Sequence, residues 1–216
     1  MQRAIFFMIL GLAVLLGGGV WYLSSARTPT TSGELDPAAG AHFVYGSPDA
    51  PVTVVEFSNY LCPHCKHHAE QNLLRIFNDY VETGKVRYVF RDFPFQGQEN
   101  VILAGEAAAC AADQGRYLDY HLLLFRASDQ WGRVAAGALP PYFKDYARQL
   151  GLDAERFGAC LDGGSKRAWV LEDQALAAKL GLTGTPSFFV NGKLVEGFRP
   201  YEEWRTILDD AIAQAR

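Results

Sequence analysis

The sequence contains no run of lysine or arginine residues, and its formal net charge is -4 with a pI of about 5.7. A basic surface patch is the electrostatic footprint of nucleic-acid binding, so nucleic acid is not an expected partner. Cysteine is also scarce, with four residues in a chain of 216. That is too few for a small domain held together by disulfides, although two pairs with three possible connectivities can form. The chain has no internal repeats.

Charged side chains are absent from Ala4 to Leu23. A helix of about 20 residues is about 30 Å long, which matches the hydrocarbon core of a bilayer. Trp21 and Tyr22 stand at the end of this stretch, and aromatic side chains favour the membrane interface. We expect residues 1–23 to form an N-terminal membrane anchor, or a signal segment with Ser24-Ser25-Ala26 as its cleavage site. Either one predicts that the rest of the chain faces an oxidising compartment, which suits the cysteines.

Residues 24–40 are rich in Ser, Thr, Pro, Ala and Gly, which is typical of a linker. Residues 41–216 are then expected to form the folded part of the chain. Since 49% of all residues are hydrophobic, this part can bury one sizeable core.

Two strand patterns surround a helix pattern at the start of the folded part. Val52–Phe57 is predicted to be a buried strand, and a short strand at Phe43–Tyr45 precedes it. Apolar residues at helical spacing predict an amphipathic helix from about Lys66 to Val81. A further strand is predicted at Val86–Arg91. The order strand, helix, strand indicates a parallel pair with a crossover helix.

Only helical patterns follow, from about residue 98 to residue 180, which predicts a helical insertion in an α/β domain. The expected helices are Glu99–Gln114, Tyr117–Arg126, Leu139–Leu150, a short one capped by Asp153 that ends near Leu161, and Ser165–Leu180. Strand patterns then return at Ser187–Val190 and Lys193–Glu196. The Asn191-Gly192 pair between them predicts a hairpin. A last helix is expected from Pro200, at a first-turn position, to about Gln214.

The sequence Cys62-Pro63-His64-Cys65 lies where the first buried strand gives way to its helix. Two cysteines at this spacing can close or open a disulfide, and the strand-to-helix position indicates a redox site. Free N–H groups at a helix start stabilise the thiolate that exchange requires, so we expect Cys62 to attack and Cys65 to resolve. Pro63 suits a first turn, and His64 adds a donor that can be cationic. A stabilised Cys62 thiolate favours the reduced form, which indicates an oxidant.

Two other interpretations of this segment stay open. The cysteine pair can be an inert disulfide, or it can bind a metal together with His64, His67 and His68. A structural zinc site usually needs a second ligand pair, and Cys110 and Cys160 are not at the required spacing. We therefore expect no metal, and we place His67 and His68 on an exposed helix face.

Glu56 is an ionisable residue within the otherwise apolar strand Val52–Phe57. It can simply point to solvent. Buried charges are rare and often functional, however, so Glu56 is also a candidate proton donor or acceptor beneath the cysteine pair, assisting Cys65.

Two motifs together resemble the thioredoxin-fold DsbA family, in particular its membrane-anchored or exported bacterial branch. The first is Val55-Glu56-Phe57 followed by Cys62-Pro-His-Cys65, and the second is Gly184-Thr-Pro-Ser-Phe-Phe-Val-Asn-Gly192. The resemblance covers the chain from about Phe43 to the C-terminus. It implies an α/β fold, with a mixed central sheet and flanking helices, interrupted by the helical insertion at about 98–180 and preceded by a transmembrane helix.

The resemblance also implies roles for individual residues. Cys62 matches the nucleophile of the family and Cys65 its buried partner. Pro63 and His64 match the dipeptide of the oxidising members, and Glu56 matches the buried acid of the strand.

The second motif implies a partner for the cysteine pair. Pro186 matches a cis-proline that faces the disulfide, and Thr185 matches the residue before it, which tunes the site. The backbone of that residue pairs with substrate peptide, so unfolded chains are expected to add as a strand at this edge.

Cys110 and Cys160 both lie on apolar helix faces of the predicted insertion. Two buried free thiols are one interpretation. A second disulfide between them is the other, and we favour it because the compartment is oxidising and some relatives in the resembled branch carry such a bridge.

The function expected from the sequence is an extracytoplasmic thiol:disulfide oxidoreductase that donates a disulfide to folding secreted proteins. A disulfide isomerase or reductase of the same fold is the first alternative, and a metallochaperone is the second. The resemblance implies reoxidation by a quinone-linked membrane oxidase of the DsbB or VKOR type. We expect no cofactor, a monomer, and a location at the bacterial cell membrane through residues 4–23, or secretion if the signal is cleaved.

Overall fold

A computed structural model describes residues 35–215. The predicted anchor at residues 1–23, and the linker before residue 35, lie outside these residues. Within residues 35–215, no helix has both the length and the apolar character needed to cross a membrane.

Five strands form one mixed sheet in the order β1-β3-β2-β4-β5. They are β1 (Phe43–Tyr45), β2 (Val52–Ser58), β3 (Val86–Asp92), β4 (Ser187–Val190) and β5 (Lys193–Glu196). Strands β2 and β3 are parallel, with Glu56 opposite Phe90, and every other neighbouring pair is antiparallel. The predicted mixed sheet is therefore confirmed. The predicted hairpin is confirmed as well, because Asn191 and Gly192 both have the positive φ angles, 47° and 81°, that its tight turn requires.

The crossover between β2 and β3 is helical from Pro63 to Val81, but it is not a regular α-helix throughout. It consists of α2 (Pro63–His68), the π-helical segment η1 (Ala69–Leu73), α3 (Leu74–Ile76) and the π-helical segment η2 (Phe77–Val81). The sequence predicts one amphipathic helix from about Lys66. The observed helix begins three residues earlier, because Pro63 occupies its first turn.

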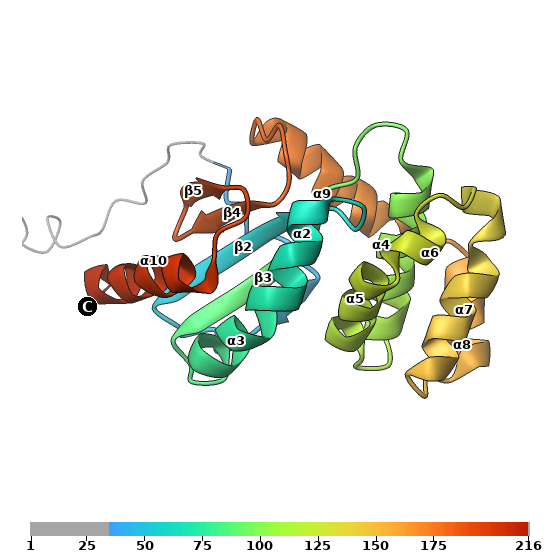
Figure 1. The fold of residues 1–216 in the computed structure, drawn as a ribbon, viewed down its shortest axis with the longest axis horizontal. Coiled ribbons are helices and arrows are strands. Elements are labelled where there is room, and N and C mark those ends of the chain that lie inside the picture. The colour runs from blue at the N-terminus through green and yellow to red at the C-terminus, as the bar shows by residue number, and fades with distance from the viewer. Residues whose placement is uncertain (1–34, 216) are drawn as a thin grey trace, which may run out of the picture. The chain divides into compact units, whose positions relative to one another are not determined.

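The segment between β3 and β4 is the predicted helical insertion (Figure 1). It contains α4 (Glu99–Ala112), α5 (Tyr117–Arg126), α6 (Ser128–Trp131), the 3₁₀ helix η3 (Ala136–Ala138), α7 (Pro140–Gln149), α8 (Ala154–Asp162) and α9 (Arg167–Lys179). Asp153 caps α8 by accepting hydrogen bonds from the N–H groups of Glu155 and Arg156, as the sequence predicts. The short helices α6 and η3 are not predicted.

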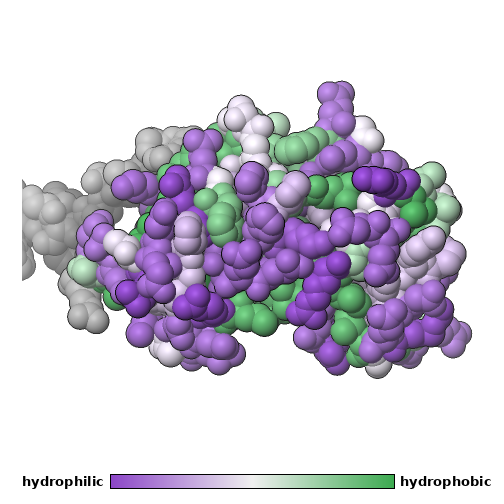
Figure 2. Space-filling view, viewed as in Figure 1, coloured by the Kyte–Doolittle hydropathy of each residue, from purple (hydrophilic) through white to green (hydrophobic). Residues whose placement is uncertain are grey.

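The last helix, α10 (Tyr201–Gln214), begins one residue later than predicted, with Pro200 as its N-cap. In Figure 1, α2, α3 and α10 lie on the viewer's side of the sheet, whereas α9 lies behind it. The strand β2 is buried on both sides, since Val54 belongs to the main core cluster and Val55 to a second cluster that includes Ala177 of α9. The viewer's face of the molecule is covered mostly by hydrophilic side chains, with hydrophobic ones showing between them (Figure 2).

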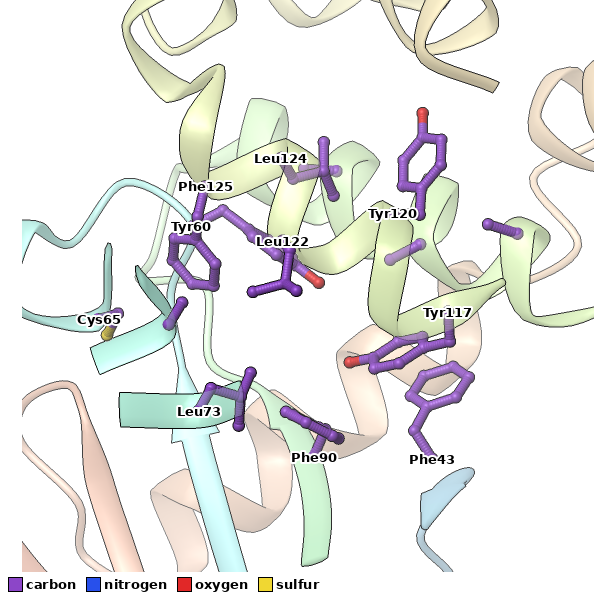
Figure 3. Packing of buried hydrophobic residues seen from close by; sticks show 14 of the residues in the cluster. Phe43, Tyr60, Cys65, Leu73, Phe90, Tyr117, Tyr120, Leu122, Leu124 and Phe125 are labelled. Atoms are coloured by element: carbon purple, nitrogen blue, oxygen red, sulfur yellow. The ribbon is translucent and has the colours of Figure 1, made fainter. Parts of the chain in front are cut away.

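Aromatic side chains join the sheet to the insertion. Figure 3 shows Tyr60, which follows β2, against Phe125 of α5, and their ring centroids are 4.9 Å apart. Phe43 of β1 stacks on Tyr117 of α5 at 4.0 Å. Because such rings bury large apolar areas, this continuous core holds α5 against the segment that leads into the cysteine pair.

Candidate active site

The chain turns sharply between β2 and α2, and this turn places Cys62 at the helix start. Cys62 is the N-cap of α2, and its N–H donates to the carbonyl oxygen of Asn59 at 3.0 Å. The Asn59 side chain is 1% exposed; its Oδ1 accepts from the N–H of Leu61, and its Nδ2 donates to the oxygens of Phe93 and Gln98. Asn59 therefore fixes the turn against the segment after β3. Asn59 is not among the predicted site residues, although asparagine in a turn is a signal for such a role.

The two cysteines have opposite environments. Both are thiols in this structure, but Cys62 is partly exposed whereas Cys65 is 0% exposed. A hydrogen bond from the Cys65 thiol, with further ones from the backbone N–H groups of Cys65 and His64, lowers the pKa of Cys62 from 9.0 to about 5. Burial raises the pKa of Cys65 well above 9.0. The pair can therefore hold one thiolate, and it lies on Cys62.

Pro63 and His64 support Cys62 through the backbone. Pro63 occupies the first helical position, where its missing N–H costs nothing. His64 is exposed, and it acts on the Cys62 pKa through its backbone N–H. His64 thus contributes to the stabilisation of the thiolate through its backbone N–H, after the larger contribution of the Cys65 thiol.

The loop before β4 faces the cysteine pair. The peptide bond between Thr185 and Pro186 is cis, in line with the resemblance. The Cys62 thiol donates to the carbonyl oxygen of Thr185 at 3.2 Å. The second sequence motif, 123 residues away from Cys62 along the chain, is therefore in direct contact with the reactive sulfur.

Glu56 is buried in β2, with 0% exposure, so it does not point to solvent. The hydroxyl of Tyr88 donates to Glu56 Oε2 at 2.7 Å, and Glu56 Oε1 is a buried atom without a hydrogen-bond partner among the described residues. Burial raises the pKa of Glu56 from 4.5 to about 7. Since this value is close to neutral pH, the carboxyl group can both give and take a proton there.

The position of His68 differs from the prediction. It is predicted on an exposed face but is 0% exposed, because the helix turns this side chain towards the sheet, while His67 is exposed. Its Nδ1 is 3.3 Å from the side-chain nitrogen of Asn72, which is a donor, so the ring proton belongs on Nε2. That nitrogen is 3.1 Å from the Tyr88 hydroxyl and 4.0 Å from Glu56 Oε2.

The buried group around Glu56 is therefore a chain of hydrogen bonds rather than an ion pair. Burial lowers the pKa of His68 to about 3, so its ring is neutral near pH 7. Asn72 donates to His68, His68 donates to Tyr88, and Tyr88 donates to Glu56. Glu56 is predicted from the sequence as part of this site, whereas Tyr88 and His68 are not. His68 and Tyr88 are 12 and 32 residues away from Glu56 in the sequence, and contacts over such separations leave no local signal.

A second buried histidine lies on the insertion side of the pair. The Tyr60 hydroxyl is 2.9 Å from His121 Nδ1, and His121 Nε2 is buried without a partner among the described residues. Burial lowers the pKa of His121 to about 3. This contact connects the insertion to the segment two residues before Cys62.

Cys110 of α4 and Cys160 of α8 are joined by a disulfide, with their Cα atoms 5.8 Å apart. Cys110 is buried and Cys160 is half-buried. The bond closes a segment of 50 residues within the insertion and is separate from the Cys62–Cys65 pair.

Within residues 35–215, no group of three or more His, Cys, Asp or Glu side chains is arranged to hold a metal ion. Cys62, His64 and His67 are exposed or partly exposed, but Cys65 and His68 turn to the interior. The histidines near the cysteines in the sequence are thus divided between two environments.

The chain is similar to known proteins in both sequence and fold. A family model described as thioredoxin matches residues 38–210. The chain is 28% identical over 181 residues to disulfide bond formation protein D of Bacillus subtilis, covering 82% of this chain and 79% of that protein. Its fold is similar to the crystal structure of Wolbachia pipientis alpha-DsbA1, with a TM-score of 0.71, 24% identity, and coverage of 80% of this chain and 91% of that one.

A further relative is much longer than this chain. The Na(+)/H(+) antiporter NhaA 3 of Salinispora tropica is 34% identical over 174 residues. That match covers 80% of this chain and 25% of the antiporter, so the chain spans about a quarter of that relative's length.

Proposed function

The chain belongs to the thioredoxin family, and from this premise we propose that it is an extracytoplasmic oxidoreductase that donates the Cys62–Cys65 disulfide to exported proteins. The motif resemblance to DsbA-like proteins is confirmed by the relatives and the fold. The observation that carries the proposal is the asymmetry of the pair, with a stabilised thiolate at Cys62 and a buried thiol at Cys65.

The proposed reaction has two exchange steps. A substrate thiolate attacks Cys62 Sγ of the oxidised pair, the Cys62–Cys65 bond breaks, and the electron pair and a proton go to Cys65. A second substrate thiolate then attacks the substrate sulfur of the mixed disulfide, and Cys62 leaves as a thiolate. The substrate loses two electrons and the enzyme gains them. A leaving thiol with a low pKa departs faster, and a stabilised reduced form makes the pair an oxidant.

Glu56 has the chemistry to manage the proton of Cys65. In the first step Cys65 must take up a proton in an interior that penalises its thiolate, and during reoxidation it must lose one. A carboxyl group with a pKa of about 7 exchanges protons readily in both directions. Tyr88 holds Glu56 in place by its hydrogen bond, and His68 holds Tyr88.

The cis-proline loop is proposed to orient the substrate. The Thr185 carbonyl oxygen already accepts a hydrogen bond from Cys62, so a backbone segment that pairs with Thr185 would bring its own cysteine to the same sulfur. Strand addition of this kind recognises backbone rather than sequence, which suits unfolded clients.

The location and the electron acceptor follow as further parts of the proposal. Residues 4–23 carry no charge and are long enough to anchor the domain in a bacterial membrane, or to export it. A quinone-linked membrane oxidase of the DsbB or VKOR type would then return the pair to the disulfide form. No bound cofactor is required for the exchange itself.

The decisive measurement is the reduction potential of Cys62–Cys65 by equilibration with glutathione, in a Cys110→Ala/Cys160→Ala variant that leaves one redox pair. We expect a value closer to about -120 mV, the potential of a strong disulfide oxidant, than to about -270 mV, the potential of thioredoxin. A value near that of thioredoxin would overturn the oxidase and favour the reductase. A Cys65→Ala variant is expected to trap the mixed disulfide with a client thiol, and failure to form any such adduct would remove Cys62 as the nucleophile.

An isomerase of the same fold is distinguished by its products. Reduced ribonuclease with free thiols tests oxidation, and ribonuclease with scrambled disulfides tests isomerisation. We expect the oxidised enzyme to act on the first substrate, and faster recovery of the second by the reduced enzyme would favour the isomerase.

A further inference from the structure

A groove of about 550 Å³ opens beside Cys62, between the start of α2 and the insertion. Leu61, Cys62 and Lys66 line it from one side, and Ser128, Asp129 and Arg133 line it from α6 and the residues after it. Its volume falls in the range of ligand-binding clefts. Because Cys62 is part of its wall, a chain whose cysteine reacts there can place neighbouring residues in this groove.

The two sides of the groove are closely packed against each other at Gly132. A Cβ atom at Gly132 would stand 2.6 Å from Leu61 Cδ2 and 2.7 Å from the Ser128 carbonyl oxygen, so glycine allows the two sides to meet. The side chain of Asn100 donates to the Gly132 carbonyl oxygen at 2.8 Å. The groove is therefore built from fixed elements of both the sheet domain and the insertion.

The net charge of the groove is opposite in sign to the net charge of the protein. The chain has a formal net charge of -4, yet the groove carries two cations, Lys66 and Arg133, and one carboxylate, Asp129. Lys66 Nζ is 3.3 Å from Asp129 Oδ2 and 3.3 Å from Ser128 Oγ. Among the described residues, no carboxylate forms an ion pair with Arg133, which is exposed. One uncompensated positive charge is left beside the reactive sulfur.

Asp129 is poorly placed to neutralise the groove. Its side chain is 93% exposed, whereas that of Lys66 is 24% exposed. An ion pair with such an exposed partner is weak and is screened by water. An incoming carboxylate thus meets Arg133 and Lys66 on the walls of the groove.

We propose that this groove is a substrate subsite that selects client segments with an acidic side chain close to the reactive cysteine. This inference rests on the disulfide-donating function proposed above and names the substrate class of that site. Attraction between opposite charges speeds encounter more than it strengthens the final complex. The preference should therefore be seen in the second-order rate constant and should weaken with salt.

The test uses three peptides of one length, each with two cysteine thiols, in which the residues flanking the cysteines are Glu, Gln or Lys. Their oxidation by the oxidised protein is followed by acid quench and chromatography at low and at high salt. At low salt we expect the Glu peptide to react about 3 to 10 times faster than the Lys peptide. At high salt, with a Debye length of about 3 Å at 1 M, the ratio should fall towards one.

Charge-reversal variants assign the effect to the groove. Arg133→Glu is expected to reverse the order of the Glu and Lys peptides. Arg205→Glu, on the exposed side of α10, changes the net charge of the protein equally and should leave the ratio as it is in the wild type.

Equal rates for the Glu and Lys peptides at low salt would overturn the subsite. The subsite would also be overturned if Arg133→Glu and Arg205→Glu changed the ratio of the Glu and Lys peptide rates by the same factor, because such a change would reflect net charge alone. If none of the three peptides is oxidised, the proposed disulfide donation itself fails. Differences in oxidation rate between the three peptides therefore test the subsite, whereas oxidation of any of them tests the disulfide-donating function.

Discussion

Both cysteine pairs of this chain can form a disulfide, but they differ in sequence separation, exposure and neighbouring groups, and these decide how a disulfide behaves. Cys62 and Cys65 are two residues apart in sequence, at a helix start, with one sulfur reachable from solvent and both present as thiols. Cys110 and Cys160 are 50 residues apart, on two packed helices, and are bonded.

The difference lies in what stabilises the thiolate. Around Cys62 the Cys65 thiol and the backbone N–H groups at the helix start favour the anion, so the reduced state gains free energy. Cys110 is buried in the main hydrophobic core on the alanine-rich helix α4, an apolar environment that disfavours a thiolate. The first arrangement favours an exchangeable disulfide, and the second favours a permanent one.

Removing the bridge in the insertion should give the largest change in stability. In a Cys62→Ala/Cys65→Ala background, adding Cys110→Ala and Cys160→Ala is expected to lower the free energy of unfolding by about 4 kcal/mol, because the unfolded chain regains the entropy of a long loop. Urea unfolding measures this. A loss below about 1 kcal/mol would mean that the bridge has no structural role and that the two pairs differ less than the structure indicates.

Glu56, the buried acid of β2, should give a pH-dependent effect of about 3 kcal/mol. Burial raises its pKa from 4.5 to about 7 in the folded protein, so the folded state binds this proton more tightly than the unfolded chain does. The stability contributed by the neutral acid is complete below about pH 4.5 and is lost as the pH rises through about 7. Glu56→Gln keeps the acceptor for Tyr88 and removes the titration.

The stability of the Glu56→Gln variant relative to wild type should therefore increase from about pH 4.5 to about pH 8, measured by denaturant unfolding at each pH. Glu70→Gln, at an exposed position of the same helical crossover, is the matched control and should give a flat difference. A flat difference for Glu56→Gln as well would place its folded-state pKa at the ordinary value and remove it as a proton donor near neutral pH.

Reducing the two disulfides should change the melting temperature in opposite directions. The change expected from reducing the reactive pair is the smallest of the predicted effects. In the Cys110→Ala/Cys160→Ala variant, reducing Cys62–Cys65 is expected to raise the melting temperature at about pH 7, because the Cys62 pKa of about 5 lets the folded state hold a thiolate. That gain should shrink as the pH falls towards about 5.

In the complementary Cys62→Ala/Cys65→Ala variant, reduction of Cys110–Cys160 should lower the melting temperature. Thermal unfolding with and without dithiothreitol compares the two variants directly. The same sign in both would contradict the division of the four cysteines into an exchangeable pair and a structural pair.

Patterns within short stretches of the sequence predict much of this fold. The period-two and period-3.6 patterns locate the five strands and the long helices within a few residues, and Asn191-Gly192 locates the hairpin. The short α6 and η3 are missed because a single turn of helix has no periodicity to detect. The alternation of α- and π-helical turns between Pro63 and Val81 is missed for the same reason.

The motif residues of the candidate site were also predictable, but their supporting partners were not. Glu56, Cys62 and Cys65 stand out by type and spacing. His68 was placed on the wrong side, since a helix with apolar residues on more than one side does not indicate which side a histidine faces. Asn59 and Tyr88 act through contacts with segments far away in the chain, and such contacts have no local pattern.

The sequence by itself determines that a cysteine pair begins a helix after a buried strand, because that depends on local spacing, a proline and hydrophobic period. Only the tertiary structure decides which groups surround the pair. Packing brings Thr185 to Cys62 from 123 residues away, buries Glu56 with His68, and opens the basic groove between α2 and the insertion. The physical reason is that a thiol's reactivity depends on charge, hydrogen bonds and burial at distances of a few ångströms, and the folded chain sets these by bringing distant residues together.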